Sequence, residues 1–158
     1  MILVTVGAQM PFPRLVDAVD DWAAAHPDAD VFAQIGDQVP VPTHLAHVPL
    51  VDPLELRTRI EDAELVVAHA GMGTIITCLE LGAPLVIFAR EGARRETRND
   101  HQVATARHFG DRPGIWVAAS IADLHDLIDR RDALRAQTPT APETSPRLLD
   151  TIRDFIDA

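Results

Sequence analysis

The sequence predicts an α/β fold in which helices cover both faces of a parallel sheet. Short runs of apolar residues alternate along the chain with longer segments whose apolar residues recur at helical spacing. Strands that are apolar along their whole length are typical of a sheet buried on both sides. A chain of 158 residues with a hydrophobic content of 47% is long enough to form one domain with a core of its own.

The first half of the chain is expected to begin with a strand and a helix. An apolar run ends in the turn Gly7-Ala8-Gln9, and the next segment carries Leu15, Val16, Val19 and Trp22 at the spacing of an amphipathic helix. A proline-rich connector then surrounds a short strand. In chain order, the expected elements are a strand at 2–6, a helix at 12–25, a strand at 30–35, a strand at 46–50 and a helix at 53–59.

The second half repeats the same alternation. The helix that follows the glycine turn Gly71-Met72-Gly73 is expected to stop at Gly82 and Pro84, two residues that commonly end helices. The apolar surroundings of Cys78, Trp22 and Trp116 predict that these three side chains belong to the core. The expected elements are strands at 65–68, 85–89 and 115–117 and helices at 74–81, 100–109 and 121–128.

The C-terminal part has a different composition. We expect the α/β domain to span residues 1–136, followed by the low-complexity linker QTPTAPETSP over 137–146 and a terminal helix over 147–158. The apolar stripe of that helix has two interpretations: it folds back on the sheet, or it docks on a partner or a neighbouring subunit.

Composition excludes several classes of function. The net charge is −10 and all 14 basic residues are arginine, which argues against nonspecific binding of nucleic acid. No apolar run approaches the length of a membrane span, and the start of the chain does not resemble a signal peptide. The single cysteine excludes an internal disulfide framework. We therefore expect a cytoplasmic chain.

The segment from 65 to 82, LVVAHAGMGTIITCLELG, is the strongest functional signal. A buried strand ends at His69, and a glycine-spaced turn leads into a helix, which is how α/β proteins build anion sites. Gly71 and Gly73 permit a ligand to approach the backbone closely. His69 is suited to bind a phosphate or a sugar hydroxyl, although a structural histidine at a strand end explains it almost as well.

Three further segments follow predicted strands and are expected at the same edge of the sheet. The turn at Gly7 and the segment from Gln34 to Asp37 are weak signals, because ordinary turns look the same. The segment 90–102 is stronger, because it combines polar side chains with four guanidinium groups suited to a diphosphate or a carboxylate. The arginines are Arg90, Arg94, Arg95 and Arg98, and the polar side chains that follow are Asn99, Asp100, His101 and Gln102.

Together, these motifs suggest a nucleotide sugar. The alternative for the last cluster is a solvated loop in which Asp100 only caps the following helix. The histidines lack the spacing of metal ligands, so we expect neither a metal nor another cofactor. The sequence also lacks GxSxG, a P-loop motif, and GxGxxG after the first strand.

Three motifs in order resemble the glycosyltransferase family 28 C-terminal domain, in particular its short stand-alone members. They are VTVGAQ with PFPRLV at the start, HAGMGTI in the middle, and RNDHQ with ATA after PLVIFAR. The resemblance covers residues 1 to about 109. It implies a Rossmann-like domain equivalent to the C-terminal half of a GT-B glycosyltransferase, which binds a UDP-sugar without a metal ion.

The resemblance also implies a donor site. The Gly7 turn and the helix start from Gly71 to Thr74 would hold the diphosphate, and His101 and Gln102 would contact the donor sugar. The full set of expected donor-binding residues is Gly7, Gln9, His69, Gly71, Met72, Gly73, Thr74, Thr77, Arg90, Arg98, Asn99, Asp100, His101 and Gln102.

The sequence departs from the family pattern at the ribose-binding position, where many relatives carry a glutamate. That position holds Thr77, and Glu80 lies on another face of the helix. The catalytic base is a second gap, because sugar transfer with inversion needs a group that deprotonates the acceptor. His69 and Glu96 are the candidates within the chain.

The resemblance implies a cytoplasmic glycosyltransferase subunit that works with a membrane-associated partner subunit and transfers sugar to a lipid-linked acceptor. Two alternatives remain open at this point. One is a self-sufficient or homodimeric enzyme acting on a UDP-sugar, and the other is a non-catalytic regulatory protein that binds a nucleotide sugar. The arginines indicate only weakly an acidic donor such as UDP-glucuronate.

Overall fold

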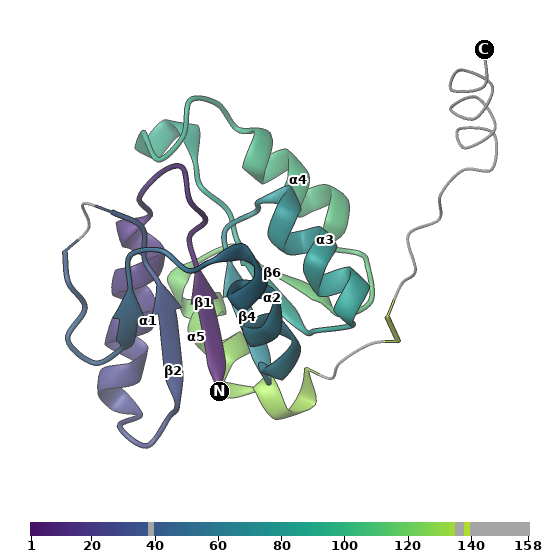
Figure 1. Ribbon diagram of the computed structural model, residues 1–158. Coiled ribbons are helices and arrows are strands. Elements are labelled where there is room, and N and C mark those ends of the chain that lie inside the picture. Colours follow the sequence, from purple (N-terminus) through teal and green to yellow (C-terminus); the bar gives the residue numbers. More distant parts are fainter. Residues whose placement is uncertain (38–39, 135–137, 140–158) are drawn as a thin grey trace, which may run out of the picture.

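The computed structural model describes residues 1–37, 40–134 and 138–139. Six parallel strands form one sheet in the order β3-β2-β1-β4-β5-β6 (Figure 1). The strands are β1 (Ile2–Thr5), β2 (Val31–Gln34), β3 (Ala46–Val48), β4 (Leu65–Ala68), β5 (Leu85–Phe88) and β6 (Ile115–Ala118). The predicted parallel sheet is confirmed.

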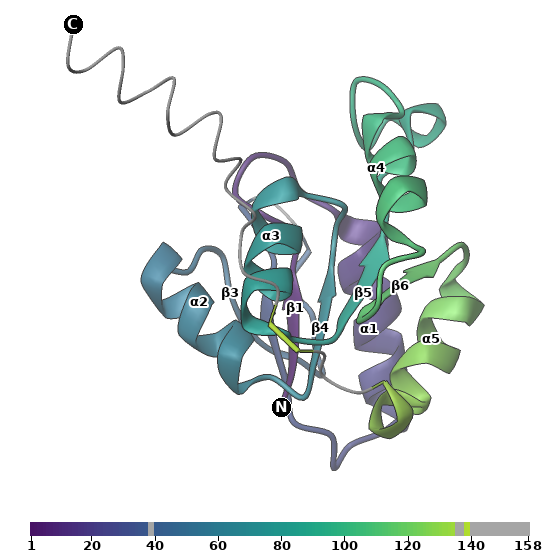
Figure 2. The same cartoon turned by 90° about the vertical axis from the view of Figure 1, so that its right-hand side faces the viewer.

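Helices cover both faces of this sheet (Figure 2). The α-helices are α1 (Pro13–Ala25), α2 (Pro53–Asp62), α3 (Met72–Leu81), α4 (His101–Phe109) and α5 (Ile121–Asp129), and two short 3-10 helices are η1 (Gly92–Arg94) and η2 (Arg131–Ala133). Helices α1 and α5 pack on one face, whereas α2, α3 and α4 pack on the other.

Successive strand residues serve the two faces in turn. In β4, Leu65 and Val67 pack with the side chains of α1 and α5, while Val66 and Ala68 pack with those of α2, α3 and α4. Because a strand alternates its side chains, a four-residue apolar run supplies two residues to each core. All four residues of β4 are buried for this reason.

The order of the strands reverses at β1. Strand β2 lies on one side of β1 and β4 lies on the other, so the chain leaves the two central strands toward opposite edges of the sheet. In open parallel sheets, ligands bind beyond the carboxyl ends of the strands at such a reversal. The turns after β1 and β4 meet there.

The element boundaries differ from those expected by a few residues. Helix α3 begins at Met72 rather than Thr74, because Gly71 is the extended residue before the helix and its carbonyl accepts from the Ile75 backbone N–H at 3.1 Å. Helix α2 runs on to Asp62, and the Arg59 side chain there donates to Glu55 at 2.7 Å, an i,i+4 pair that stabilises the helix. Such shifts are ordinary at helix ends.

The core predictions are confirmed. Cys78 and Trp22 are buried, and Trp116 is partly buried against the same core as Trp22. The predicted helix over 147–158 and all of the predicted linker except residues 138–139 lie outside the described residues. Among the helices of the described segments, none combines the length and apolar character needed to cross a lipid bilayer.

Candidate functional site

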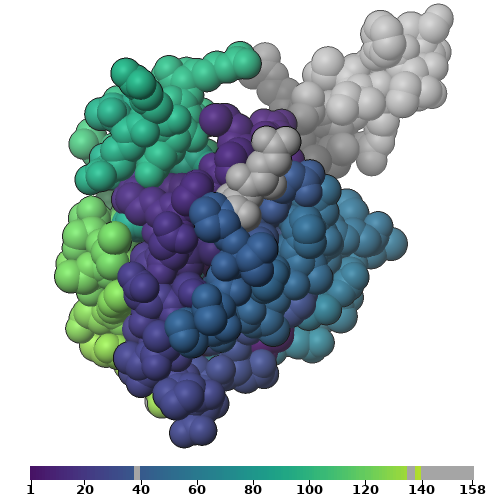
Figure 3. All heavy atoms as spheres, turned by 90° about the vertical axis from the view of Figure 1, so that its left-hand side faces the viewer, coloured from purple at the N-terminus to yellow at the C-terminus, as the bar shows by residue number. Residues whose placement is uncertain are grey.

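A cavity of about 430 Å³ lies at the carboxyl ends of β1 and β4, between the first turns of α3 and α4. The segment after β5 and helix α4 form one side of the cavity, and the turn after β1, from Val6 to Met10, lies opposite them at the same end of the molecule (Figure 3). Ten of the expected donor-binding residues line it: Gly7, Gln9, His69, Gly71, Met72, Gly73, Thr74, Arg90, His101 and Gln102. The structure thus brings together segments that are far apart in the sequence.

Four expected donor-binding residues do not line the cavity. Thr77 lies one turn further along α3, and its hydroxyl donates to the Gly73 carbonyl at 2.9 Å. The Asp100 carboxylate accepts from the Gly92 backbone N–H at 2.8 Å rather than capping α4, and the Asn99 side chain accepts from the His101 backbone N–H at 3.2 Å. Arg98 is exposed.

Sequence reasoning missed six lining residues. Four of them, Val6, Ala8, Met10 and Ala70, lie within or beside the two glycine turns that were expected at the site. The other two, Thr97 and Thr105, add hydroxyl groups on the side formed by the segment after β5 and by α4. Thr105 lies three residues after Gln102, on the same face of α4. This helical spacing is the feature of the sequence that could have identified Thr105 as a lining residue.

The His69 ring is held between the two glycine turns. A Cβ added to Gly7 would lie 2.6 Å from the ring Cε1, and one added to Gly71 would lie 2.1 Å from Nε2. Real Cβ atoms do not approach so closely, so both positions require glycine. Gly7 also has a φ of +76°, a conformation that favours glycine. The two glycine turns therefore leave room for the His69 ring, in addition to any close approach that they allow to a ligand.

The environment of His69 favours the neutral ring. Burial, and then the charge of Arg90, lower the pKa of His69 to about 4, and the Thr5 carbonyl opposes this shift. Nδ1 lies 3.5 Å from that carbonyl, which can only accept. A proton on Nδ1 therefore faces the carbonyl and leaves Nε2 as an acceptor. His69 at neutral pH offers a lone pair rather than a positive charge.

This shift makes the stability of the protein depend on pH. Because the pKa of His69 is lower in the folded state than its ordinary value of about 6.5, the unfolded chain takes up the proton first as the pH falls. The contribution of His69 is fully present above pH 6.5 and is lost toward pH 4. Between pH 7 and pH 5 we expect a loss of about 2 kcal/mol in the free energy of unfolding from this group.

Urea unfolding of the wild type and of His69→Asn at pH 7 and pH 5 measures this contribution. Groups other than His69 titrate in both proteins, so the wild type should lose about 2 kcal/mol more than the variant between the two pH values. Equal losses in the two proteins would show that His69 is not held neutral.

Arg90 forms the floor of the cavity and is only 3% exposed. Its Nη2 donates to the Val6 carbonyl at 2.8 Å and to the Met10 carbonyl, and its guanidinium lies 4.8 Å from the centre of the Phe12 ring. Nε has no hydrogen-bond partner among the described residues. A buried cation that lines a cavity is suited to an anionic ligand, because its charge is little screened by water there.

Gln102 is tied to the same arginine. Its side-chain oxygen accepts from the Arg90 backbone N–H at 3.2 Å, and the residue is 7% exposed. Since the oxygen is used in this contact, the amide nitrogen is the group that remains for a ligand. Gln102 therefore adds a second donor to the cavity.

A buried polar network supports the turn after β1. Thr5 Oγ1 donates to Gln34 Oε1 at 2.6 Å, and Gln34 Nε2 donates at 3.0 Å to the carbonyls of both Gly7 and Pro49. The segment from Gln34 to Asp37 thus contributes to the site chiefly by holding the Gly7 turn in place. Gln34 itself does not line the main cavity.

Glu96, the second candidate base, does not line the cavity. Both of its carboxylate oxygens accept from Arg14, at 2.6 and 2.7 Å. Although burial alone would raise it, hydrogen bonds from Arg14 and the Glu91 backbone hold the pKa of Glu96 below its ordinary value. A carboxylate so engaged is a weak base, and this geometry does not favour a catalytic role.

The arginines of the segment 90–102 separate in the structure. Arg90 is buried, whereas Arg94 is exposed and its Nε donates to Glu91 at 3.1 Å. Arg95 and Arg98 are exposed as well. Only Arg90 lines the cavity, so the expected cluster of four positive charges reduces to a single buried one at the site.

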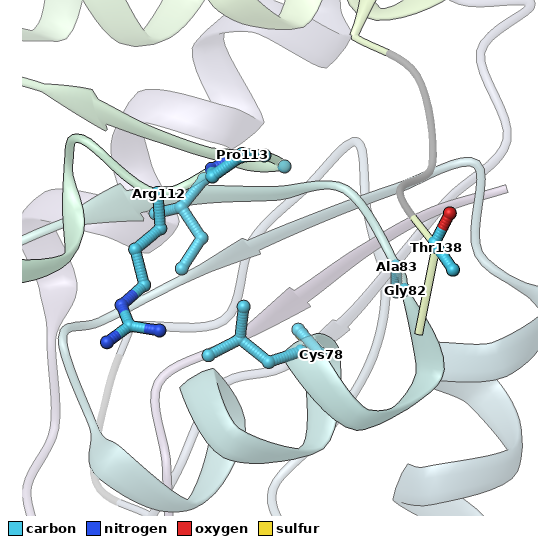
Figure 4. A pocket seen from close by; sticks show the side chains of 9 residues that line it. Cys78, Gly82, Ala83, Arg112, Pro113 and Thr138 are labelled. Carbon is cyan, nitrogen blue, oxygen red and sulfur yellow. The ribbon is translucent and has the colours of Figure 1, made fainter. Parts of the chain in front are cut away.

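A second hollow, of about 280 Å³, lies at the opposite end of the sheet. It is formed by the end of α3, by Arg112 and Pro113 before β6, and by Thr138 (Figure 4). The Cys78 thiol at its base is unreactive, because burial raises its pKa to about 12. Within the described residues, no group of three or more His, Cys, Asp or Glu side chains is placed to bind a metal ion.

The sheet order, the helix that starts after Gly71 and the cavity beside it define a doubly wound α/β domain with a candidate ligand site at the reversal of strand order. The family model of the glycosyltransferase family 28 C-terminal domain matches residues 1–148. The chain belongs to this family.

Two curated relatives are similar in sequence. The chain is 30% identical over 73 residues to the UDP-N-acetylglucosamine transferase subunit ALG13 of Candida albicans, which covers 46% of this chain and 23% of that protein. It is 29% identical over 116 residues to the UDP-N-acetylglucosamine--N-acetylmuramyl-(pentapeptide) pyrophosphoryl-undecaprenol N-acetylglucosamine transferase of Granulibacter bethesdensis, covering 65% of this chain and 29% of that one. The matches thus span less than a third of either relative.

Solved structures confirm the predicted fold. The solution structure of ALG13 superposes with a TM-score of 0.60 at 18% identity, covering 99% of this chain and 96% of that one. MurG of Acinetobacter baumannii superposes with a TM-score of 0.62 at 18% identity, covering 96% of this chain and 49% of that one. The chain is a Rossmann-like domain equivalent to the C-terminal half of a GT-B glycosyltransferase.

Proposed function

We propose that this chain is the donor-binding subunit of a glycosyltransferase and that a UDP-sugar occupies the cavity between α3 and α4. The observation that carries the proposal is the position of Arg90, a buried cation that lines the cavity beside the start of α3, at the reversal of strand order. Family membership and the relatives named above as UDP-N-acetylglucosamine transferases support the same class of donor.

The diphosphate would lie between the start of α3 and Arg90. The backbone N–H groups of the first turn of a helix carry partial positive charge, and Gly71 to Thr74 present them to the cavity. Arg90 would add a full charge from below. Because these groups neutralise the leaving diphosphate together, we propose that transfer needs no metal ion.

The donor sugar would contact the side of the cavity formed by the segment after β5 and by α4. Gln102 offers its amide nitrogen there, and His101, Thr97 and Thr105 supply further polar groups. These residues are suited to bind the hydroxyls of a hexose. The uracil base would rest near Met72 and Ile76, two side chains one turn apart on α3 that are each 46% exposed.

The acceptor side of the reaction would come from a partner. Among the described residues, no aspartate or glutamate lines the cavity, and the Glu96 carboxylate is bound to Arg14. His69 offers a lone pair but lies mostly buried between the glycine turns. We therefore propose that a membrane-associated subunit brings the lipid-linked acceptor and the catalytic base, and that it recruits this cytoplasmic chain to the membrane.

Calorimetric titration of the purified chain tests the proposal. The titrants are UDP, UDP-glucose, UDP-N-acetylglucosamine and UDP-glucuronate, each with EDTA and again with added Mg²⁺. We expect saturable binding of one UDP-sugar, tighter than that of UDP and unaffected by EDTA. Absence of binding by all four would contradict the proposal for the isolated chain. Turnover of the UDP-sugar by the chain alone would favour a self-sufficient enzyme.

A further inference from the structure

Arg14 crosses from α1 to the segment that follows β5. Its Nη2 donates to the Ala89 carbonyl at 2.9 Å and to Glu96 Oε2 at 2.7 Å, and its Nε donates to Glu96 Oε1 at 2.6 Å. Arg14 and Glu96 are 82 positions apart in the sequence. A guanidinium that meets both oxygens of a carboxylate fixes the direction of that side chain as well as its distance.

Aromatic rings hold this ion pair in place. The Arg14 guanidinium lies 4.2 Å from the centre of the Phe88 ring and 5.3 Å from that of Phe12. The two rings stack with their centres 5.9 Å apart, and Arg90 lies over Phe12 from the cavity side. Arg90 therefore ties the segment after β5 to the turn after β1, and Arg14 ties the same segment to the first turn of α1.

Glu96 organises the residues that follow it. Its Oε2 also accepts from the Glu91 backbone N–H at 2.9 Å, which closes the loop from 91 to 96. Within that loop, the Gly92 backbone N–H donates to Asp100 just before α4. The residue next to Glu96 is Thr97, which lines the cavity, and His101 and Gln102 follow within one turn of α4. The ion pair is therefore connected to one side of the cavity without reaching into it.

We propose that Arg14 and Glu96 are positioning residues, which hold the segment 97–102 against the cavity so that it contacts the sugar of the donor. The inference rests on the proposed function, because it assigns the sugar to this side of the cavity. It also assigns to Glu96 a role different from that of a base, since both carboxylate oxygens are already bound within the protein.

Glu96→Gln is the most informative change. Whichever way the amide is turned, its NH₂ group replaces an oxygen that accepts from Arg14 or from the Glu91 backbone, so donor faces donor. Arg14→Gln removes the guanidinium that binds Glu96, and the variant that carries both changes completes a double-mutant cycle. Glu80→Gln is the matched control, because Glu80 accepts from Arg57 at 2.8 Å in an ion pair between α3 and α2, away from the cavity.

The measurement is the affinity for the preferred UDP-sugar divided by the affinity for UDP. We expect this ratio to fall roughly five- to tenfold in Glu96→Gln and in Arg14→Gln, because a small displacement of binding groups weakens oriented contacts strongly. The double variant should lose no more than either single variant, because both changes break one interaction. Glu80→Gln should keep the ratio of the wild type.

Equal losses of UDP and UDP-sugar affinity, or a ratio unchanged from that of Glu80→Gln, would overturn the proposal. Hydrogen exchange of the free proteins gives a test that needs no ligand. The amides of Gly92, Arg95 and Ala104 are hydrogen-bonded within the loop that Glu96 closes and at the start of α4. These amides should exchange faster in Glu96→Gln than in the wild type, while those of β1 and β4 keep their protection. If the wild type binds no UDP-sugar, the proposed function fails, and hydrogen exchange still decides whether the ion pair holds this segment.

Discussion

Gly71→Ala is expected to weaken UDP-sugar binding about 100-fold, because the new Cβ would displace either His69 or the start of α3. The Cβ would lie 2.1 Å from His69 Nε2, and the ring cannot withdraw because Gly7 touches it from the other side. The backbone of Gly71 itself, at φ −89° and ψ 129°, suits alanine. The loss would therefore come from the collision and not from backbone strain.

Stability measurements separate this effect from a general disruption of the fold. Gly71→Ala should lower the free energy of unfolding by about 2 kcal/mol, as overpacking does. The double variant His69→Ala/Gly71→Ala should recover most of that loss, because the colliding ring is gone. Gly73→Ala is a control for stability alone: no atom lies within 4 Å of its Cβ, so alanine should stabilise α3 by roughly 0.5–1 kcal/mol. Normal UDP-sugar binding by Gly71→Ala would contradict this account of the turn.

Arg90→Met is expected to weaken UDP-sugar binding by about 100-fold as well, because it removes both the buried charge and the anchor of the turn after β1. The carbonyls of Val6 and Met10 would lose their donor. The pKa of His69 should rise from about 4, since the charge of Arg90 contributes to lowering it, while burial would keep it below its ordinary value. NMR titration of the His69 ring measures that change.

Arg112→Met is the matched control for Arg90→Met. Arg112 also lies over an aromatic ring, 5.4 Å from the centre of Phe109, but it borders the hollow at the opposite end of the sheet. This control should bind the UDP-sugar as the wild type does. If the two variants lose the same affinity, or if neither loses any, Arg90 is not the cation that holds the diphosphate.

Much of the fold and part of the site could be predicted from local patterns. The continuous apolar run from Leu65 to Ala68 indicates a strand buried on both faces, and the glycines after it indicate a helix start that approaches a ligand or a ring. These signals lie within about ten consecutive residues. The turn at Gly7 and the segment around Gln102 could be assigned to the same edge because parallel strands share their direction.

The remaining features depend on contacts between distant segments. The sequence shows four arginines close together but not that only Arg90 is buried, because its burial depends on Phe12 and on the turn after β1. In the sequence, Glu96 is a candidate catalytic base, but in the structure its carboxylate is bound by Arg14, which is 82 positions away. Local patterns carry no information on such pairs. Of the four arginines expected at the site, one lines the cavity and three do not.

Chemical-shift mapping by NMR with the preferred UDP-sugar tests the central claim most directly, since it reports where the donor binds. Labelled protein is titrated in EDTA, and the backbone amides are followed. The account predicts that the largest saturable shifts occur at Gly7 and Gln9, from Gly71 to Thr74, and from Thr97 to Thr105, with little change around Gly82 and Arg112. Shifts concentrated at the hollow beside Gly82 and Arg112, or no saturable shifts at all, would contradict a donor site between α3 and α4.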